Sequence, residues 1–95
     1  MEIKLLIINV IFASMKEKEN EKLNAKAIYN AVLKKIIAER TALGITQINV
    51  AQQLGIGENG YFKIEKGKTK LDLERLLLIL EVLEITPIDF FKGIK

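Results

Sequence analysis

Apolar residues follow two different patterns along this chain. Residues 3–13 (IKLLIINVIFA) form one continuous apolar run, whereas beyond residue 23 apolar side chains recur at steps of three and four. Steps of this size place apolar side chains on one face of a helix. The first such stripe consists of Leu23, Ala27, Ala31, Leu33, Ile36, Ile37 and Leu43. It predicts a long helix that ends near Gly44, since glycine favours the turn that follows a helix.

Two short helices are expected next, and each has its own boundary residues. Thr46 can cap a helix over 47–54, because its hydroxyl can accept a hydrogen bond from a free amide of the first turn. Gly55 suits the left-handed turn that ends this helix. A second helix is expected over 58–66 and ends at Gly67. The side chains predicted to face inward from this segment are Val50, Ala51, Leu54, Ile56, Tyr61 and Ile64.

Two further helices complete the predicted fold. Asp72 can cap the first of them, and Thr86 can cap the second, which has Pro87 in its first turn. The side chains expected to be buried are Leu73, Leu76, Leu77, Leu80 and Leu83 in the first helix, and Phe90 or Phe91 in the second. Five helices joined by short turns predict an all-α fold. The length suits one domain, expected over 23–95 after an apolar arm and polar linker over 1–22.

The apolar run near the start of the chain has three interpretations. It is too short to span a bilayer, and its Ile and Val content favours a β-strand or an interaction arm. Alternatively, Met15 is the true start of translation, or the run is a signal peptide cleaved after Ala13. The signal peptide is the weakest of the three interpretations, because Ile11 stands where a small residue is expected.

Composition narrows the chemistry that this chain can perform. It has 15 Lys and Arg against 12 Asp and Glu, and four lysines but only one acid, Glu65, lie between Gly60 and Lys70. The absence of cysteine from the sequence excludes disulfides and thiolate metal sites. Histidine, the usual general base and zinc ligand, is also missing from the sequence. We therefore expect no enzymatic activity, no metal and no cofactor.

The turn between the two short helices is the feature with the clearest functional meaning. Only Gly55, Ile56 and Gly57 separate the two helices. A sharp turn of this kind lets the second helix project from the body, where it can enter a DNA major groove about 12 Å wide. An ordinary helical hairpin has the same spacing, so spacing alone leaves both interpretations open.

Two nucleotide-binding patterns occur in the same region but lack their context. Residues 55–60 form a literal GxGxxG string. A dinucleotide site needs a strand before this string and a βαβ unit of about 30 residues, whereas a helix is predicted here. Gly67-Lys68-Thr69 matches the end of a phosphate-binding loop, but Phe62 stands where that motif requires its first glycine.

The chain resembles the lambda-repressor-like, or XRE, family of helix-turn-helix regulators over the segment ITQINVAQQLGIGENGYFKIEKGKTKLDLERLLLILEVLEITPIDFF. The resemblance extends over about residues 33 to 91. Its matching points are Thr46-Gln47, Ala51, Leu54-Gly55-Ile56, the block from Lys63 to Lys68, and the Leu-rich helix followed by Pro87. The resemblance implies that the two short helices form a DNA-binding unit, with the second as the recognition helix.

The resemblance also implies roles for individual residues. The positions that would contact duplex DNA are Gln47, Gly57, Glu58, Asn59, Gly60, Phe62, Lys63, Lys66, Lys68 and Lys70. Asn59 is chemically suited to adenine and Lys63 to guanine or a phosphate, while the later lysines would contact phosphates. Arg40 and Glu65 fall where family members hold a partly buried ion pair, so a structural role is expected for these two.

Several residues depart from the family pattern. Gly57 replaces a common serine and is a weaker cap. Glu58 is acidic where a neutral residue is usual, so it would repel phosphate while suiting a cytosine amino group. Phe62 replaces a small polar residue and could touch a thymine methyl group or another protein. Leu71 replaces a frequent proline in the connector after the recognition helix.

The resulting expectation is a cytoplasmic transcriptional regulator of bacterial or phage type. It would bind duplex DNA as a homodimer on a pseudo-palindromic site, with no membrane association. The apolar arm over 3–12 is the candidate dimerisation element, since an unpaired exposed strand invites aggregation. The alternative is a protein-interaction module on the same scaffold, such as the antitoxin-like partner of a small toxin. Glu58, Phe62 and the arm motivate that alternative.

Overall fold

The computed structural model describes residues 24–94, which form helices joined by short turns. The helices are α2 (Ala25–Ala42), α3 (Gln47–Leu54), α4 (Glu58–Glu65), α5 (Leu73–Leu83) and α6 (Pro87–Lys92). The described residues contain no strand, and none of their helices is long and apolar enough to cross a membrane. The all-α prediction is therefore confirmed. The arm and linker predicted over 1–22 lie outside the described residues.

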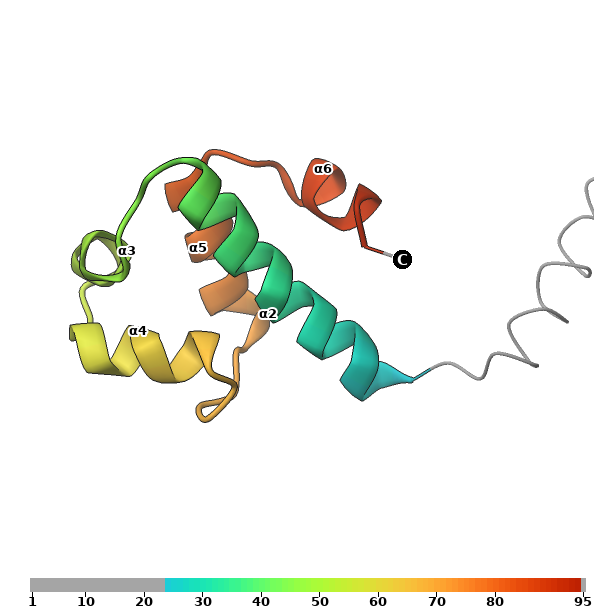
Figure 1. Cartoon of the computed structure of the whole chain (residues 1–95), viewed down its shortest axis with the longest axis horizontal. Helices are drawn as coiled ribbons and strands as arrows, with labels where there is room; N and C mark the ends of the chain where they lie inside the picture. Colours follow the sequence, from blue (N-terminus) through green and yellow to red (C-terminus); the bar gives the residue numbers. More distant parts are fainter. Residues whose placement is uncertain (1–23, 95) are drawn as a thin grey trace, which may run out of the picture.

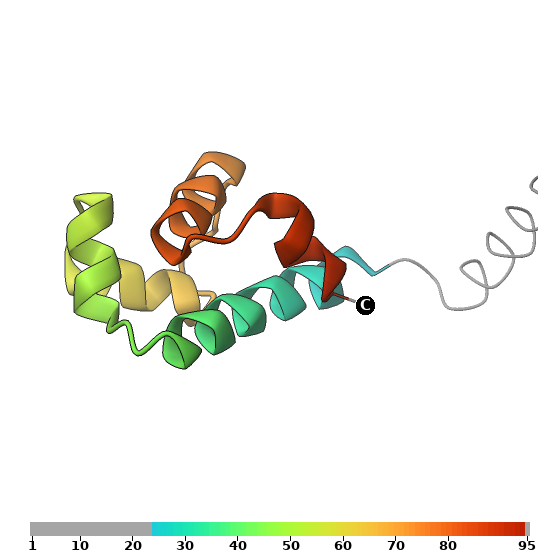
Figure 2. The same cartoon turned by 90° about the horizontal axis from the view of Figure 1, so that it is seen from above.

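The long helix α2 is the element around which the others are arranged. In Figure 1 it runs diagonally through the molecule, with α3 and α4 on one side of it and α6 on the other. The view from above shows α5 standing to one side of α2 (Figure 2). Helix α6 is held to α2 by Phe90, whose ring centroid lies 5.7 Å from the Lys35 ammonium nitrogen. This arrangement leaves one side of α4 free of the other helices.

The core lies between the helices, with α3 packed against both α4 and α5, α2 against α4, and α6 against α5. Its most completely buried large side chains are Val50, Tyr61, Ile36, Ile79, Leu80 and Phe90. All five helices therefore contribute to a single apolar cluster, with Leu54 and Ile56 packed against its margin. Burial of a large apolar side chain contributes about 1.5–3 kcal/mol. This cluster is consequently the main source of stability for such short helices, which are marginal in isolation.

The predicted helix boundaries rest on caps that the structure confirms. Thr46 accepts a hydrogen bond from the Asn49 amide at 3.1 Å, and Asp72 accepts one from the Arg75 amide at 2.7 Å. Thr86 caps α6 in the same way. These bonds satisfy backbone donors that have no partner inside the helix. Asn24, for which no cap is predicted, accepts a hydrogen bond from the Ala27 amide and so caps α2.

The predicted buried faces are correct in part. Tyr61 and Ile64 are buried as expected, and of the two phenylalanines Phe90 is buried while Phe91 is exposed. The prediction is wrong for Leu73 and Leu77, which are 70% and 43% exposed, whereas Ile79 is fully buried. Leu73 begins α5 beyond the end of the core. Leu77 lies about 100° around the helix from the buried Leu76.

The stripe predicted for the long helix also needs correction. Leu43 is 56% exposed because it follows the last helical residue, and Ala27 is exposed as well. Val32, which was not predicted, is buried beside Leu33. Leu23 lies outside the described residues. The first two turns of α2 therefore bury less than the periodicity suggested.

Two glycines of the α3–α4 region should respond in opposite ways to replacement by alanine. Gly55 has a left-handed backbone with φ of 71°, so Gly55→Ala should destabilise the domain by about 1–2 kcal/mol. Gly60 lies inside α4, and a Cβ there would meet no atom within 4 Å. Gly60→Ala should therefore stabilise the domain by about 0.5–1 kcal/mol. Urea denaturation of both variants checks this, and a loss of stability in Gly60→Ala would contradict it.

Candidate nucleic-acid interface

Helices α3 and α4 are joined by a turn that fixes their relative direction. Gly55 ends α3 in the left-handed conformation, and its amide donates to carbonyls of the last turn of α3. The Ile56 amide donates to the Ala51 carbonyl at 3.0 Å, and Ile56 packs against the core. In Figure 1 α3 is seen end-on while α4 lies across the view, so the two helices point in clearly different directions. The turn thus directs α4 away from α3 along the edge of the molecule.

Helix α4 buries one side and exposes the other. Tyr61, Ile64 and Glu65 face inward and are buried. Phe62 is half-buried, and the residues of α4 exposed to solvent are Glu58, Asn59, Gly60 and Lys63. Gly57 precedes the helix and makes no side-chain cap. The exposed side of α4 therefore consists of residues that are predicted to contact DNA.

The beginnings of α3 and α4 share one open hollow of about 240 Å³. Its lining residues are Gln47 from α3 and Glu58, Asn59 and Phe62 from α4. Four of the predicted contact residues are thus brought together on one surface. Their amide, carboxylate and aromatic groups offer both hydrogen-bonding and apolar contacts, which suits recognition of base edges.

The predicted lysines continue from α4 into the connector that follows it. Lys66, Lys68 and Lys70 are exposed, as is Lys63 in α4. The Lys66 ammonium nitrogen lies 5.5 Å from the centroid of the Phe62 ring, an arrangement in which the ring face attracts the cation. The Lys63 carbonyl accepts hydrogen bonds from the amides of Lys68, at 2.9 Å, and Thr69. These bonds fold the connector back against the end of α4 and gather its cations there.

Three helices meet at the carboxylate of Glu65. Arg40 of α2 donates from Nε to Oε2 of Glu65 at 2.6 Å and from Nη2 to Oε1 at 3.0 Å. Gln47 of α3 donates from Nε2 to the same Oε1 at 2.9 Å. Arg40 also donates from Nη1 to the Ile45 carbonyl at 2.9 Å. Only 3% of the Glu65 side chain is exposed, so this bidentate pair is shielded from solvent.

Comparison with known families agrees with this geometry. A family model described as helix-turn-helix matches residues 36–91, a range that contains α3 and α4 and most of the surrounding helices. The chain belongs to this helix-turn-helix family. Its members, of the lambda-repressor-like or XRE type, are DNA-binding transcriptional regulators, as the resemblance implied. No curated protein and no solved structure matches the chain.

The electrostatics of the helix-turn-helix depend on the Arg40–Glu65 pair. Burial by itself would raise the pKa of the Glu65 carboxyl group, because a charge is costly in an apolar interior. Hydrogen bonds, with that from Arg40 the strongest, outweigh burial and lower the pKa of Glu65 below its usual value. The hydrogen bond to Glu65 in turn raises the pKa of Arg40. Both groups are therefore charged at neutral pH.

Tyr61 lies beside this pair on the inner face of α4. Burial, reinforced by the neighbouring Glu65, raises the pKa of its phenol far above the ordinary value. Among the described residues its buried hydroxyl has no hydrogen-bond partner. The hydroxyl stays neutral and lies in the field of the pair, which compensates in part for its burial.

Two contacts of the helix-turn-helix were not foreseen from the sequence. The Tyr29 hydroxyl of α2 accepts a hydrogen bond from the Leu71 amide at 2.9 Å, across 42 positions of sequence. The Gln47 amide, expected only at DNA, donates to Glu65. For the contact between Tyr29 and Leu71, the one signal in the sequence is a tyrosine four residues before Leu33, on the side of the helix that is predicted to be buried. Nothing in the local sequence indicated the second.

Removing the Glu65 charge should cost stability at neutral pH but not in acid. Glu65→Gln leaves Arg40 without its counter-charge, so we expect a loss of about 3 kcal/mol at pH 7, the lower end for a broken buried pair. Because the folded pKa of Glu65 is lowered, its stabilisation is present above the unfolded pKa and is lost as pH falls through the folded pKa. The two proteins should therefore converge in acid.

Urea denaturation at a series of pH values measures this difference. Glu81→Gln, at an exposed position of α5, is the matched control and should change stability at pH 7 by no more than about 0.5 kcal/mol. A constant difference between the wild-type protein and Glu65→Gln from neutral to acidic pH would contradict the proposed contribution of the ion pair.

Proposed function

We propose that this protein is a transcriptional regulator that binds specific duplex DNA sites as a homodimer. The observation that carries the proposal is the exposed side of α4, which presents polar and basic side chains beside the turn that projects it. Membership of a DNA-binding regulator family supports the same interpretation. A helix about 10–12 Å across, packed on its inner side against α3 and α2, has the dimensions of a major-groove reader.

Base recognition is assigned to the hollow at the beginning of α4. Asn59 can make a bidentate contact with adenine. Lys63 lies outside the hollow, one turn later on the exposed side of α4, and can reach guanine. Glu58 can accept a hydrogen bond from the cytosine amino group, and Phe62 can contact a thymine methyl group. Gly57 and Gly60 have no side chain, so they allow the DNA to approach the backbone closely.

Positioning on the DNA backbone is assigned to the lysines and to Gln47. Lys66, Lys68 and Lys70 are exposed on and after the last turn of α4, where they can neutralise phosphates. The hydrogen bond to Glu65 fixes the Gln47 amide, leaving one N–H and the carbonyl oxygen for DNA. A fixed donor loses less entropy on binding than a free side chain does.

Binding measurements should distinguish contacts with base edges from contacts with phosphates. Asn59→Ala should weaken binding to the preferred site by about 1–3 kcal/mol and leave binding to a random duplex nearly unchanged. Lys68→Ala should weaken binding to the preferred site and to a random duplex by a similar factor. It should also make the negative slope of log K against log salt shallower by about 0.9. The preferred site is obtained by selecting bound sequences from a random duplex pool.

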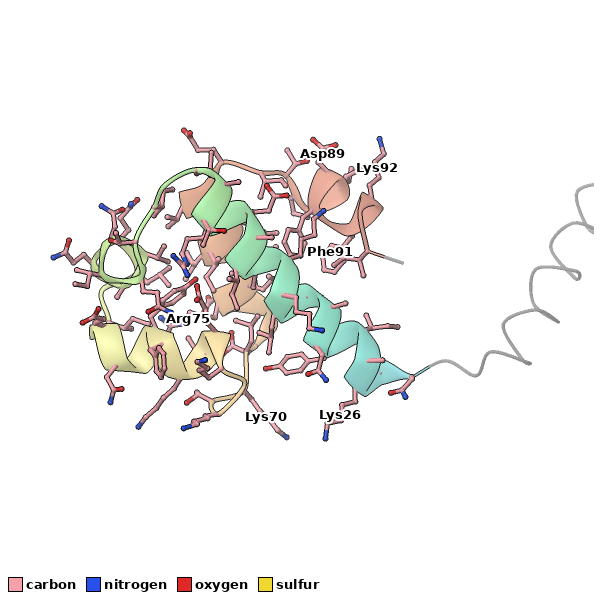
Figure 3. The ribbon with its side chains drawn as sticks, in the orientation of Figure 1. Lys26, Lys70, Arg75, Asp89, Phe91 and Lys92 are labelled. Atoms are coloured by element: carbon pink, nitrogen blue, oxygen red, sulfur yellow. The ribbon has the colours of Figure 1, made fainter. Side chains whose placement is uncertain are left out.

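The matched control for both variants is Lys92→Ala, on α6 at the far side of the molecule, which should change neither property (Figure 3). An absence of measurable affinity for any duplex at low salt would contradict the proposed function.

The dimer and its pseudo-palindromic site belong to the same proposal. One such domain makes few phosphate contacts, so two copies on half-sites about one helical turn apart are the economical arrangement. The apolar arm over 3–12, which lies outside the described residues, remains the candidate dimerisation element. Its two copies could pair as strands and so protect their edges.

Deleting the arm should therefore abolish the dimer. A chain that begins at Met15 is expected to sediment as a monomer in analytical ultracentrifugation, while its circular dichroism remains that of the folded helices. Its affinity for a full pseudo-palindromic site should fall towards that for a half-site. If the shortened chain still sediments as a dimer, the arm is not the dimerisation element.

A second function is favoured by one observation in the hollow. Phe62 is half-buried among polar residues, with Lys66 above its ring, and aromatic side chains of this kind are enriched at protein interfaces. The protein-interaction module, with an antitoxin-like role as one form of it, would use this surface to bind a partner protein. The duplex-binding measurement above discriminates between the two functions.

A further inference from the structure

The first half of α2 lies outside the part of the chain that the family model matches. The match begins at residue 36, whereas α2 begins at Ala25. These additional turns bury little, since Val32 and Leu33 are their only fully covered side chains. The few apolar side chains that this segment buries therefore do not explain its length.

One face of α2 runs antiparallel to the end of α4 and the connector. Arg40 contacts Glu65, and two turns earlier Leu33 lies beside Gly67, where an added Cβ would be 3.5 Å from the leucine methyl carbon. One turn earlier again, Tyr29 accepts the hydrogen bond from the Leu71 amide. The contacts thus advance in opposite directions along the two segments. They hold the connector against the first half of α2.

Lys26 extends this face by one more turn. It is three residues before Tyr29, a spacing that places both side chains on the same side of the helix, and it is exposed. Lys70 immediately precedes Leu71, the partner of Tyr29. In Figure 3 both lysines extend from the lower edge of the molecule, the edge along which α4 lies. The basic surface of α4 and the connector therefore continues to the start of α2.

The position of Lys26 is unfavourable for the isolated helix. It lies in the first turn of α2, which contains no acidic residue, so its charge is next to the positive end of the helix dipole. A polyanion at this edge would remove that repulsion.

We propose that the first half of α2 extends the DNA-contacting surface beyond the helix-turn-helix. Lys26 and Lys70 together contact phosphates flanking the half-site, and Tyr29 is a positioning residue that holds the connector in register with them. This inference rests on the proposed DNA-binding function. The partner is a nucleic-acid backbone rather than a base sequence, because Lys26 and Lys70 offer flexible ammonium groups and no planar hydrogen-bonding side chain.

The test is binding of the full chain to a short random-sequence duplex over a range of salt concentrations. Lys26→Ala should make the negative slope of log K against log salt shallower by about 0.9. It should also lower the affinity about fivefold to tenfold near 0.1 M salt. The same factor should apply to a selected site, since phosphates carry no sequence information. Melting temperature should stay constant or rise, because the substitution removes a cation from the helix N-terminus.

Lys92→Ala is the matched control, since it removes the same charge from the opposite edge of the molecule in Figure 3 and should leave the slope unchanged. Tyr29→Phe removes the acceptor of the Leu71 amide and should weaken duplex binding at temperatures far below the melting transition, with the salt slope retained. A purely structural tyrosine would lower the melting temperature and leave affinity intact.

The outcomes separate this inference from the proposed function. If the wild-type chain binds duplex DNA but Lys26→Ala retains its full salt slope, the extension is wrong while DNA binding stands. If the wild-type chain has no affinity for duplex DNA even at low salt, both fail. If Lys26→Ala reduces binding to polyglutamate but not to the duplex, Lys26 and Lys70 contact an acidic protein and the inference is overturned.

Discussion

The buried carboxylate of Glu65 is the constraint on which the arrangement of the helices depends. It lies at the end of α4 and accepts hydrogen bonds from Arg40 of α2 and Gln47 of α3. A charge in an apolar interior is tolerated only with such partners, so each of the three helices is held at the distance that these bonds require. Arg40 also reaches the Ile45 carbonyl and so anchors the segment that leads into α3. The angle between α3 and α4 is therefore supported from beneath by polar bonds as well as by apolar packing.

The same carboxylate connects the structural side of α4 with its exposed side. Gln47 lines the hollow in which Asn59 and Glu58 lie, yet its amide is bound to Glu65 inside the domain. A hydrophobic replacement of the Arg40–Glu65 pair could be as stable, since buried ion pairs often contribute little net energy. It would, however, leave Gln47 without its partner. The pair is thus better explained by the orientation it gives to the surface than by the stability it gives to the core.

Local signals in the sequence were enough for the helix boundaries but not for every buried face. The caps Thr46, Asp72 and Thr86 act within one turn, so their effect could be predicted from neighbouring residues. In α5 the residues 76–80 are all apolar, and periodicity cannot then decide which side is buried. The exposed Leu77 and the buried Ile79 follow from the positions of α2, α3 and α6 instead. The hydrogen bonds from the Leu71 amide to Tyr29 and from Gln47 to Glu65 join distant segments, which no local pattern predicts.

The exposed edge of the domain departs from rules that favour stability, and these departures occur together. Gly57 is a cap without a side chain, Gly60 interrupts α4, and Lys26 puts a cation at the positive end of α2. Each choice costs a helix a few tenths of a kcal/mol to about 1 kcal/mol. On the opposite side of α4, the apolar side chain of Ile64 is buried in the core, as the helical pattern predicts. Destabilising residues that cluster on one surface of an otherwise regular domain are expected where that surface binds a partner. The positive charge of this edge indicates that the partner is a polyanion.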